Sequence, residues 1–432
     1  MMLGTTVLLL LLLAGSGVFV AAVLGVLGGI LAQAFSTFPL IRGLGEVAWG
    51  ASAEFILVAV PMFILMGELL LRSGVTDSMY KALDRWVGHL PGGLMHTNVA
   101  ASAVFAATSG SSIATAATIG TVSIPIMDKH GYRASMFLGT IAAGGTLGIL
   151  IPPSINMVLY GAMSETAVSD LYLAALIPGV MLACMFSLYV YIACKINPSL
   201  APRSQSSSWA ERISALVHLV PPLFLFLLVV GSIYAGLATA TEASALGVMG
   251  ALALVVWRRR FSVQMLLRSF EGTVRTTAMV MAIVIAAYFL NFVLSTLGLT
   301  DAAVKWVGQL NWSPMAILMC IIVLYVVLGC FVESLTLMVA TTPVVVPIIQ
   351  HLGFSPVWFG VVFVILIETA LITPPIGMNL FVVQSVRKGG DFRDVVMGSL
   401  PFVALMFLLI LLLIAFPSLA LWLPELFAST RA

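Results

Sequence analysis

Two proline pairs, at residues 152–153 and 374–375, interrupt stretches that otherwise have the apolar composition of membrane helices. Proline has no backbone N–H, and its ring clashes with the carbonyl group four residues earlier. The carbonyls of Gly148 and Ala370 are among those left without helical partners. An unpaired carbonyl in hydrocarbon is costly, so another group must satisfy each one.

Side chains with neutral oxygen atoms flank both breaks. Ser154 and Asn156 follow the first proline pair, and Thr369, Thr373 and Asn379 surround the second. Carbonyl, hydroxyl and amide oxygens are hard ligands that suit a small hard cation. One such break is more often a packing kink, whereas two breaks at matching positions favour a pair of cation sites.

Small polar residues form a second feature upstream of each break. Residues 108–112 read Thr-Ser-Gly-Ser-Ser between apolar segments, and residues 333–336 read Glu-Ser-Leu-Thr. Backbone of this kind is tolerated at membrane depth only where it lines a cavity, so each run predicts the tip of a re-entrant hairpin. Helices are expected to begin near Ser112 and Ser334, where their N–H groups would attract an anion. The alternative is a helix-packing motif of small residues.

Two acidic residues, Glu333 and Glu368, lie in apolar surroundings, where a carboxylate is either functional or a hydrogen-bonded structural acid. Glu54, Glu68 and Glu242 lie nearer the ends of the predicted spans and are interpreted as structural. The histidines and cysteines form no metal-binding spacing, and the sequence has no GxxxxGK[ST] phosphate loop. The sequence therefore predicts neither a transition-metal centre nor ATP hydrolysis.

The elements that must position these residues occur twice. A shift of 222 residues superimposes the two proline pairs and places Ser112 on Ser334. The same shift places LGVLG at residues 24–28 on LGVMG at residues 246–250. Duplicated halves are common in secondary transporters, where they are often inverted relative to each other.

The repeat predicts three parts of the chain. They are a first repeat at residues 1–196, a polar linker rich in proline and serine at residues 197–212, and a second repeat at residues 213–432. Each repeat is expected to contain scaffold helices, a hairpin and a broken helix. Residues 35–50 and 261–276 mix leucine with charged residues, so each is expected to form an amphipathic helix along the membrane surface.

The composition places most of the chain in a membrane. The 432 residues are 61% hydrophobic and 8% charged, whereas a soluble domain is about 25% charged. A span needs roughly 20 apolar residues, so the chain has room for about ten to twelve spans. The first span is expected to be retained, up to about Leu31, rather than cleaved as a signal peptide. Basic residues at 195–212 and 258–260 predict cytoplasmic loops, and no basic face suits nucleic acid.

Five stretches resemble the large membrane subunit of tripartite ATP-independent periplasmic (TRAP) transporters, the DctM-like family. They are AVPMFILMGELLLRSG (59–74), SGSSIATAATIGTVSIPIMDKHGY (109–132), AAGGTLGILIPPSINMVLYG (142–161), TATEASALGV (239–248) and ETALITPPIGMNLFV (368–382). The resemblance covers essentially the whole chain. It implies an all-α polytopic membrane protein with two inverted repeats, re-entrant hairpins and broken transmembrane helices, as in elevator-type carriers of the ion-transporter superfamily.

The resemblance also implies an activity. It indicates secondary active symport of a small organic anion, such as a C4-dicarboxylate, sialic acid or another sugar acid, with Na+ as the coupling ion and no other cofactor. The substrate would come from a periplasmic binding protein. Because the chain begins with the large-subunit portion, a separate small subunit with four spans is expected. The chain would be a multi-pass protein of the bacterial inner membrane and not an enzyme.

The resemblance assigns site residues by position. A first sodium site is expected at Ser109, Gly110, Ser111, Ser112, Gly145, Gly148, Pro152 and Asn156. A second is expected at Glu333, Ser334, Thr336, Thr369, Thr373 and Asn379. The substrate is expected between the two tips, at Ser111, Ser112, Ser154, Ser334 and Thr336.

Other functions remain open at this point. A single-component symporter for divalent anions and Na+ would work without a binding protein. An ion channel usually builds its pore from several short chains, which suits this long duplicated chain less well. An intramembrane enzyme needs a catalytic constellation at membrane depth, and the sequence has no HExxH, no GxSxG and no paired aspartates in its apolar spans.

Overall fold

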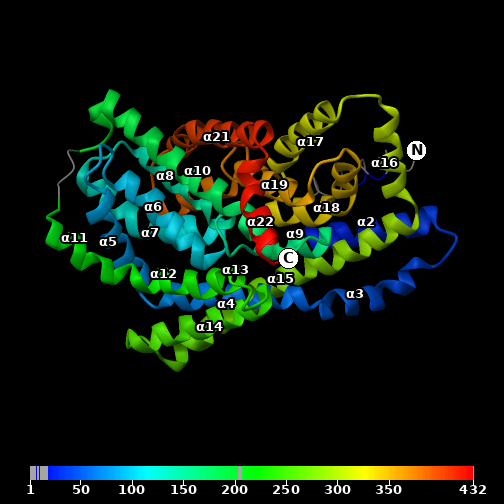
Figure 1. Ribbon diagram of the computed structural model, residues 1–432, viewed down its shortest axis with the longest axis horizontal. Coiled ribbons are helices and arrows are strands. Elements are labelled where there is room, and N and C mark those ends of the chain that lie inside the picture. Colours follow the sequence, from blue (N-terminus) through cyan, green and yellow to red (C-terminus); the bar gives the residue numbers. More distant parts are fainter. Residues whose placement is uncertain (1–5, 7–8, 10–17, 203–206, 432) are drawn as a thin grey trace.

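The computed structural model in Figure 1 describes residues 6, 9, 18–202 and 207–431. This part of the chain is built of helices and turns and contains no β-strand. The helices of the first half are α2 (Val20–Phe35), α3 (Leu44–Ala53), α4 (Ala59–Arg72), α5 (Val75–Val87), α6 (Leu94–Ser109), α7 (Ser112–His130), α8 (Ala134–Leu150), α9 (Ile155–Ser164) and α10 (Val168–Ile196).

Three short helices follow, namely α11 (Trp209–Ala215), α12 (Val220–Phe226) and α13 (Ser232–Tyr234). The second half contains α14 (Ala240–Trp257), α15 (Val263–Thr296), α16 (Leu299–Gln309), α17 (Pro314–Gly329), α18 (Ser334–His351), α19 (Pro356–Leu371), α20 (Met378–Arg387), α21 (Phe392–Ala415) and α22 (Ser418–Arg431). Figure 1 shows α6, α7 and α8 on one side of the centre and α17 and α18 on the other.

Corresponding helices of the two halves begin at corresponding residues. Helices α7 and α18 begin at Ser112 and Ser334, and α8 and α19 begin at Ala134 and Pro356, so both pairs are 222 residues apart. The predicted fold class, an all-α membrane protein with hairpins and broken helices, is confirmed. The exact limits of the repeats and the linker stay a prediction, and residues 203–206 of the linker lie outside the described part.

Both predicted helix breaks are present. Helix α8 ends at Leu150, and α9 continues at an angle of 42° after the first proline pair. Helix α19 ends at Leu371, and α20 begins at Met378 after the second pair. Both Pro–Pro peptide bonds are cis. The carbonyl oxygen of Ala370, whose usual helical partner is replaced by Pro374, accepts a hydrogen bond of 3.2 Å from the backbone N–H of Thr373 instead.

Both predicted hairpin tips are also present. Helices α6 and α7 pack against each other and are joined by Gly110 and Ser111. Gly110 has a φ of 60°, and a Cβ at this position would lie 3.1 Å from the carbonyl oxygen of Pro153. A glycine therefore lets the tip turn sharply against the first helix break. In the second half, α17 and α18 are joined by residues 330–333.

The remaining long helices form a scaffold in which α15 packs against α2, α3 and α4, and α4 also packs against α14. Residues 261–276 do not form a separate surface helix as predicted, because most of them belong to the 34-residue helix α15. Their counterparts in the first half do form a separate helix, α3. Helix α3 ends because the backbone of Glu54 is extended, with a ψ of 113°, whereas α15 continues without a break.

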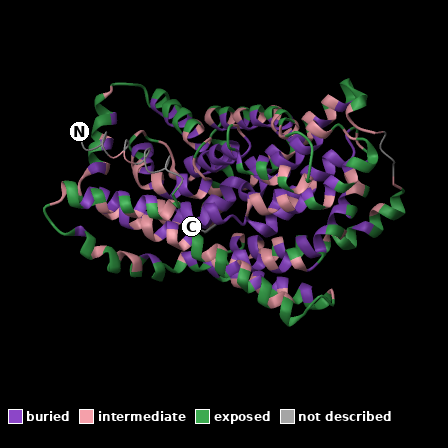
Figure 2. Cartoon of the chain, turned by 180° about the vertical axis from the view of Figure 1, so that it is seen from behind, coloured by how far each residue is buried: buried purple, intermediate pink, exposed green. Residues whose placement is uncertain are grey.

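Among the described residues, six helices are long and apolar enough to cross a membrane, or up to eight if each bent pair counts as one span. The expected ten to twelve spans overestimate this number, because several apolar segments are helices of 10–17 residues. Figure 2 shows buried residues concentrated along the middle of the molecule and exposed residues along the outer helices. Part of the predicted first span lies outside the described residues, whereas α2 lies within them.

Candidate functional site

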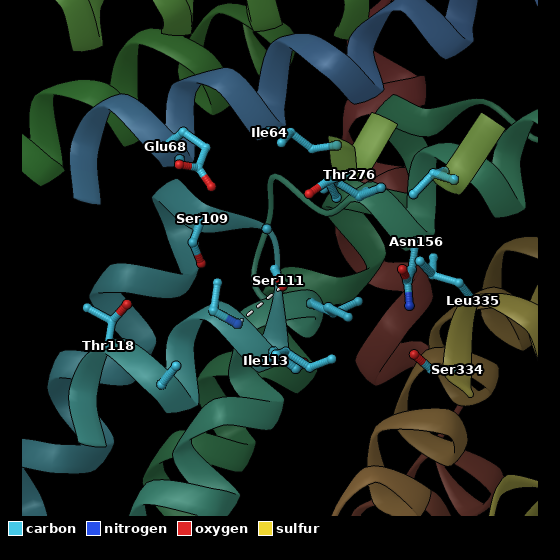
Figure 3. Close-up of a pocket in the computed structure, with 18 of the residues that line it drawn as sticks. Ile64, Glu68, Ser109, Ser111, Ile113, Thr118, Asn156, Thr276, Ser334 and Leu335 are labelled. Carbon is cyan, nitrogen blue, oxygen red and sulfur yellow. Dashed lines mark hydrogen bonds between the residues drawn. The ribbon is translucent and has the colours of Figure 1, made fainter. Parts of the chain in front are cut away.

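A cavity of about 360 Å³ lies between the two hairpin tips and the scaffold helices α4 and α15. Figure 3 shows Ser111 of the first tip and Ser334 of the second facing this space from different elements. The predicted site residues that line the cavity are Ser109, Gly110, Ser111, Ser112, Asn156, Glu333 and Ser334. Two segments more than 200 residues apart thus contribute to one cavity.

The first tip is a compact group of oxygen atoms. The hydroxyls of Ser109 and Thr115 lie 2.9 Å apart, and the Thr115 hydroxyl donates to the carbonyl oxygen of Ser111 at 2.7 Å. Gly148 of α8 packs so closely here that a Cβ would lie 2.6 Å from the same carbonyl oxygen. The structure thus brings Gly148 to the serines of the first tip, with the backbone oxygen of Ser111 between them.

Ser112 connects this tip to the other half of the chain. Its hydroxyl donates a hydrogen bond to Oε2 of Glu368, a fully buried residue of α19. The other carboxylate oxygen, Oε1, is buried and has no hydrogen-bond partner. The sequence identified Glu368 as an intramembrane acid but assigned it to neither site, because a contact between α7 and α19 has no signature in the sequence.

Asn379 also lies at the first tip, although the resemblance grouped it with the second. Its amide nitrogen donates to the carbonyl oxygen of Ala142 at 3.4 Å, and its Oδ1 has no partner. A Cβ at Gly145 would lie 3.0 Å from this amide nitrogen and 3.1 Å from the carbonyl oxygen of Ser112. Asn379 is therefore adjacent to the backbone that carries Ser112.

Asn156 of the first half lies near the second tip, just as Asn379 of the second half lies at the first. It is 1% exposed, its amide nitrogen has no hydrogen-bond partner, and it lines the cavity together with Ser334. In Figure 3 its side chain points toward Ser334. Helix α9 packs against α18, and α20 packs against α7. Each helix that follows a break thus packs against the hairpin of the opposite half.

The second tip differs from the first because it carries its own carboxylate. Glu333 precedes α18 and accepts hydrogen bonds from the backbone N–H of Thr336 at 3.0 Å and from its hydroxyl at 3.2 Å. The Ser334 hydroxyl donates to the same carboxylate at 3.1 Å. An acidic side chain at a helix N-terminus is stabilising and occupies donors that an anionic ligand would otherwise use.

Several predicted residues lie behind the cavity rather than on its wall. Ser154 is buried and caps α9 by accepting a hydrogen bond of 3.4 Å from the backbone N–H of Met157. The hydroxyls of Thr369 and Thr373 each donate to a carbonyl one turn earlier in the chain at 2.6 Å. The predicted residues outside the wall are Gly145, Gly148, Pro152, Ser154, Thr336, Thr369, Thr373 and Asn379.

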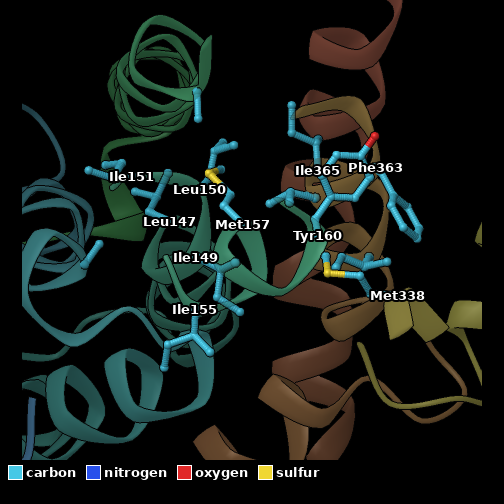
Figure 4. Close-up of a cluster of buried hydrophobic side chains, with 14 of the residues drawn as sticks. Leu147, Ile149, Leu150, Ile151, Ile155, Met157, Tyr160, Met338, Phe363 and Ile365 are labelled. Carbon is cyan, nitrogen blue, oxygen red and sulfur yellow. The ribbon is translucent and has the colours of Figure 1, made fainter. Parts of the chain in front are cut away.

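A cluster of buried apolar side chains packs the first helix break against the second half. Figure 4 shows Ile149, Ile155 and Tyr160 among buried apolar side chains that include Phe363. The Tyr160 hydroxyl donates to the carbonyl oxygen of Pro356 at 2.7 Å, and its ring contacts Phe363 edge-on. This packing holds α9 to α19 and so keeps the break in place.

The charges around the cavity are acidic. Glu333 and Glu68 line it, and Glu68 forms an ion pair with Arg72. No lysine, arginine or histidine is found among the described lining residues. The described residues also contain no cluster of three or more His, Cys, Asp or Glu side chains that suits a metal ion. An anion in this cavity would need bound cations or helix N-termini to balance its charge.

Comparisons with known proteins bear on this arrangement. The family model described as "Tripartite ATP-independent periplasmic transporter, DctM component" matches residues 5–419. The chain is 33% identical over 407 residues to the C4-dicarboxylate TRAP transporter large permease protein DctM of Pseudomonas aeruginosa, with 93% of each chain covered. It is 33% identical over 386 residues to the sialic acid TRAP transporter large permease protein SiaM of Vibrio cholerae, with 88% of each covered. The ectoine TRAP transporter large permease protein TeaC of Halomonas elongata is 32% identical over 371 residues, with 86% of each covered.

Two solved structures share the fold. The YdaH transporter of Alcanivorax borkumensis superimposes with a TM-score of 0.67 at 15% identity, covering 96% of this chain and 98% of its own. MtrF of Neisseria gonorrhoeae superimposes with a TM-score of 0.61 at 13% identity, covering 89% of this chain and 84% of its own. At these identities the likeness concerns the fold alone.

Proposed function

The chain belongs to the DctM component family of tripartite ATP-independent periplasmic transporters, and we propose that it imports a small organic anion by sodium-driven symport. It is a large permease with multiple membrane-spanning helices. The names of its relatives refer to C4-dicarboxylates, sialic acid and ectoine. The first two are organic anions, and ectoine is a zwitterion that also carries a carboxylate. We place the chain in the inner membrane of a bacterium.

The charged residues that line the cavity are the main support for sodium as the coupling ion. A carboxylate substrate would enter a space with no basic side chain among the described lining residues, where Glu68 is paired with Arg72 and Glu333 has no ion-pair partner among the described residues. Cations bound next to the cavity would offset the repulsion between Glu333 and the substrate, so substrate binding would depend on cation binding. The oxygen atoms at the first tip, including the unpartnered Oε1 of Glu368 and Oδ1 of Asn379, are suitable ligands for Na+.

We propose two sodium sites, one behind each tip. The first would use Ser109, Gly110, Ser111, Ser112, Gly145, Gly148, Pro152 and Asn379. The second would use Glu333, Ser334, Thr336, Thr369, Thr373 and Asn156. The exchange of the two asparagines follows from the packing of α20 against α7 and of α9 against α18. Ser111, Ser112 and Ser334 would contact the substrate, because they line the cavity between the tips.

We further propose that transport uses an elevator movement. The hairpins and broken helices, α6 to α9 and α17 to α20, would slide as one body against α2, α4, α14 and α15. The cavity lies at the border between these two groups, with Ile64 and Thr276 on the scaffold side and Ser111 on the other. A site at such a border changes its exposure when one group moves relative to the other.

Two partners complete the proposal. A small membrane subunit with four spans would bind the scaffold as a separate chain, and a periplasmic binding protein would deliver the substrate. Uptake in vesicles with and without the binding protein would test this part. Equal uptake in both cases would favour the single-component symporter instead.

Sodium binding can be tested without knowing the substrate. The purified protein should unfold at a higher temperature in NaCl than in KCl or choline chloride of equal concentration, because a ligand that binds only the folded state stabilises it. The stabilisation should saturate with sodium concentration. An identical unfolding temperature in all three salts would argue against sodium as the coupling ion.

A further inference from the structure

A second cavity, of about 290 Å³, lies between α5, the segment after α11 and the loop after α14. It shares no lining residue with the cavity between the hairpin tips. Lys81, Arg85, His218 and Arg260 contribute basic side chains to its wall, and Asp77 contributes the one acidic side chain among the described lining residues. We call this cavity the basic pocket.

Basic side chains outnumber acidic ones in the lining of the basic pocket, where Lys81, Arg85 and Arg260 face Asp77. Neither of the two ion pairs found in the described part of the chain involves Lys81, Arg85 or Arg260. Two further acids lie near Arg85. Glu211 of the neighbouring α11 also takes part in a capping box, accepting a hydrogen bond of 2.9 Å from the backbone N–H of Ser208, and Asp84 also interacts with the hydroxyl of Thr97 at 3.3 Å. Clustered like charges repel one another unless an anion lies among them.

Another arginine reaches the wall of this pocket. Nη2 of Arg258 donates to the hydroxyl of Ser78 at 3.0 Å, and Ser78 is a lining residue. The Nε atom of the same arginine is buried without a hydrogen-bond partner. The loop after α14 therefore brings a second positive charge to the same place as Arg260.

The basic pocket joins the two basic segments that the sequence places on the cytoplasmic side. Arg260 comes from the segment at residues 258–260, and His218 lies shortly after the segment at 195–212. The indole N–H of Trp86 in α5 donates to the carbonyl oxygen of Arg212 at 3.0 Å. Figure 1 shows α5 and α11 side by side at one end of the molecule. Both segments thus meet on one face.

The surroundings of the pocket have the character of a membrane surface. Trp209 and Trp257 are exposed, and the guanidinium groups of Arg212 and Arg258 lie 5.2 Å and 5.9 Å from the respective ring centres. Tryptophan is enriched where headgroups meet hydrocarbon. Val217, Val220 and Val256, which lie next to the pocket segments in the sequence, are exposed apolar side chains.

We propose that the basic pocket binds the phosphate headgroup of an anionic phospholipid from the cytoplasmic leaflet. The lysine and arginines would neutralise the phosphate, and the acyl chains would lie on the apolar surface next to the tryptophans. Basic pockets on the cytoplasmic side of membrane proteins bind such headgroups. The lipid would hold α5, α11 and the loop after α14 together. This proposal does not depend on the substrate or the coupling ion.

The test compares lipids and variants in the full-length protein. The protein is placed in nanodiscs of phosphatidylcholine with increasing phosphatidylglycerol, and the bound lipid is counted by native mass spectrometry. We expect retained phosphatidylglycerol in the wild type and about tenfold or more weaker retention in the Lys81→Gln/Arg85→Gln variant, since each basic group near the surface contributes about 1 kcal/mol. The single variant Arg260→Gln should show a smaller loss of retained phosphatidylglycerol. It keeps the test valid if the double variant does not fold.

Lys305→Gln is the matched control. Lys305 matches Arg85 when RWVG at residues 85–88 is aligned with KWVG at residues 305–308. It lies on the exposed surface of α16 and does not line the basic pocket. It should leave lipid retention unchanged. Equal retention of phosphatidylcholine, equal retention by the double variant, or displacement of the lipid by millimolar inorganic phosphate alone would each overturn the proposal.

Discussion

The hydroxyl of Ser112 donates a hydrogen bond to the carboxylate of Glu368, which lies 256 residues later in the chain. This contact joins the tip of the first hairpin to the broken helix of the second half. Asn379, from the same half as Glu368, lies at the backbone of the same tip. The first tip is therefore built by both halves of the chain. The affinity for a cation bound there would depend on how the two halves are positioned.

Replacing Glu368 by glutamine should weaken sodium binding. The amide keeps the shape of the side chain and can still accept a hydrogen bond from Ser112, but the negative charge is lost. Because a charge next to a cation is effective in a water-poor interior, we expect the half-saturating sodium concentration to rise about tenfold or more. Isothermal titration with NaCl measures this directly.

Glu54→Gln is a suitable control, because Glu54 is an exposed residue between α3 and α4. Its sodium titration should match that of the wild type. An unchanged titration in Glu368→Gln would show that Glu368 has only a structural role.

The exchange of asparagines between the halves predicts a pattern of energetic coupling. Ser112→Ala and Asn379→Ala should each raise the half-saturating sodium concentration, and their effects should not be additive, because both residues belong to the first tip. Asn379→Ala combined with Thr336→Ala should be close to additive. Sodium-dependent thermal unfolding of the single and double variants gives both comparisons. The opposite pattern would place Asn379 at the second tip.

Close packing at the first tip predicts a steric effect of a single methyl group. Gly148→Ala would bring a Cβ to 2.6 Å from the carbonyl oxygen of Ser111, where backbone cannot easily move. We expect a loss of about 1–3 kcal/mol in stability, together with weaker sodium binding. The unfolding temperature in detergent measures the loss. Gly45→Ala, with no atom within 4 Å of the added Cβ, should behave as the wild type.

The proposed elevator movement predicts a rate effect at Gly67. This residue of α4 faces the first tip, and a Cβ here would lie 3.4 Å from the carbonyl oxygen of Ser109. A leucine at this position should obstruct sliding and slow transport by tenfold if it adds about 1.4 kcal/mol to the barrier. The half-saturating sodium concentration at equilibrium should change by a smaller factor than the transport rate. Gly45→Leu provides the control, and an unaffected rate in Gly67→Leu would oppose sliding at this border.

The sequence predicted those features that depend on local chemistry. The helix starts at Ser112 and Ser334 follow from polar tips after apolar segments, and the breaks follow from proline pairs. The 34-residue length of α15 was not predicted, because the mixed polarity of residues 261–276 favoured a separate surface helix. Helix propensity and polarity along a segment do not determine whether the helix continues beyond the membrane surface, because that depends on the helices that pack against it.

Contacts between the halves could not be predicted from one sequence. Asn156 and Asn379 each occupy the second position of a helix after a break, so the resemblance assigned each to its own half. Their actual neighbours depend on how α9 and α20 cross to the opposite hairpin. The hydrogen bond between Ser112 and Glu368 has the same origin, since no periodicity within α7 or α19 encodes it.

Uptake into sealed vesicles tests the central claim most directly. The chain would be reconstituted with the proposed small membrane subunit, and the proposed binding protein would be loaded with radiolabelled C4-dicarboxylate or sialic acid in separate experiments. An inward sodium gradient should drive accumulation of one of these compounds, and an equal potassium gradient should not. Accumulation of that compound to the same level without sodium would contradict the account.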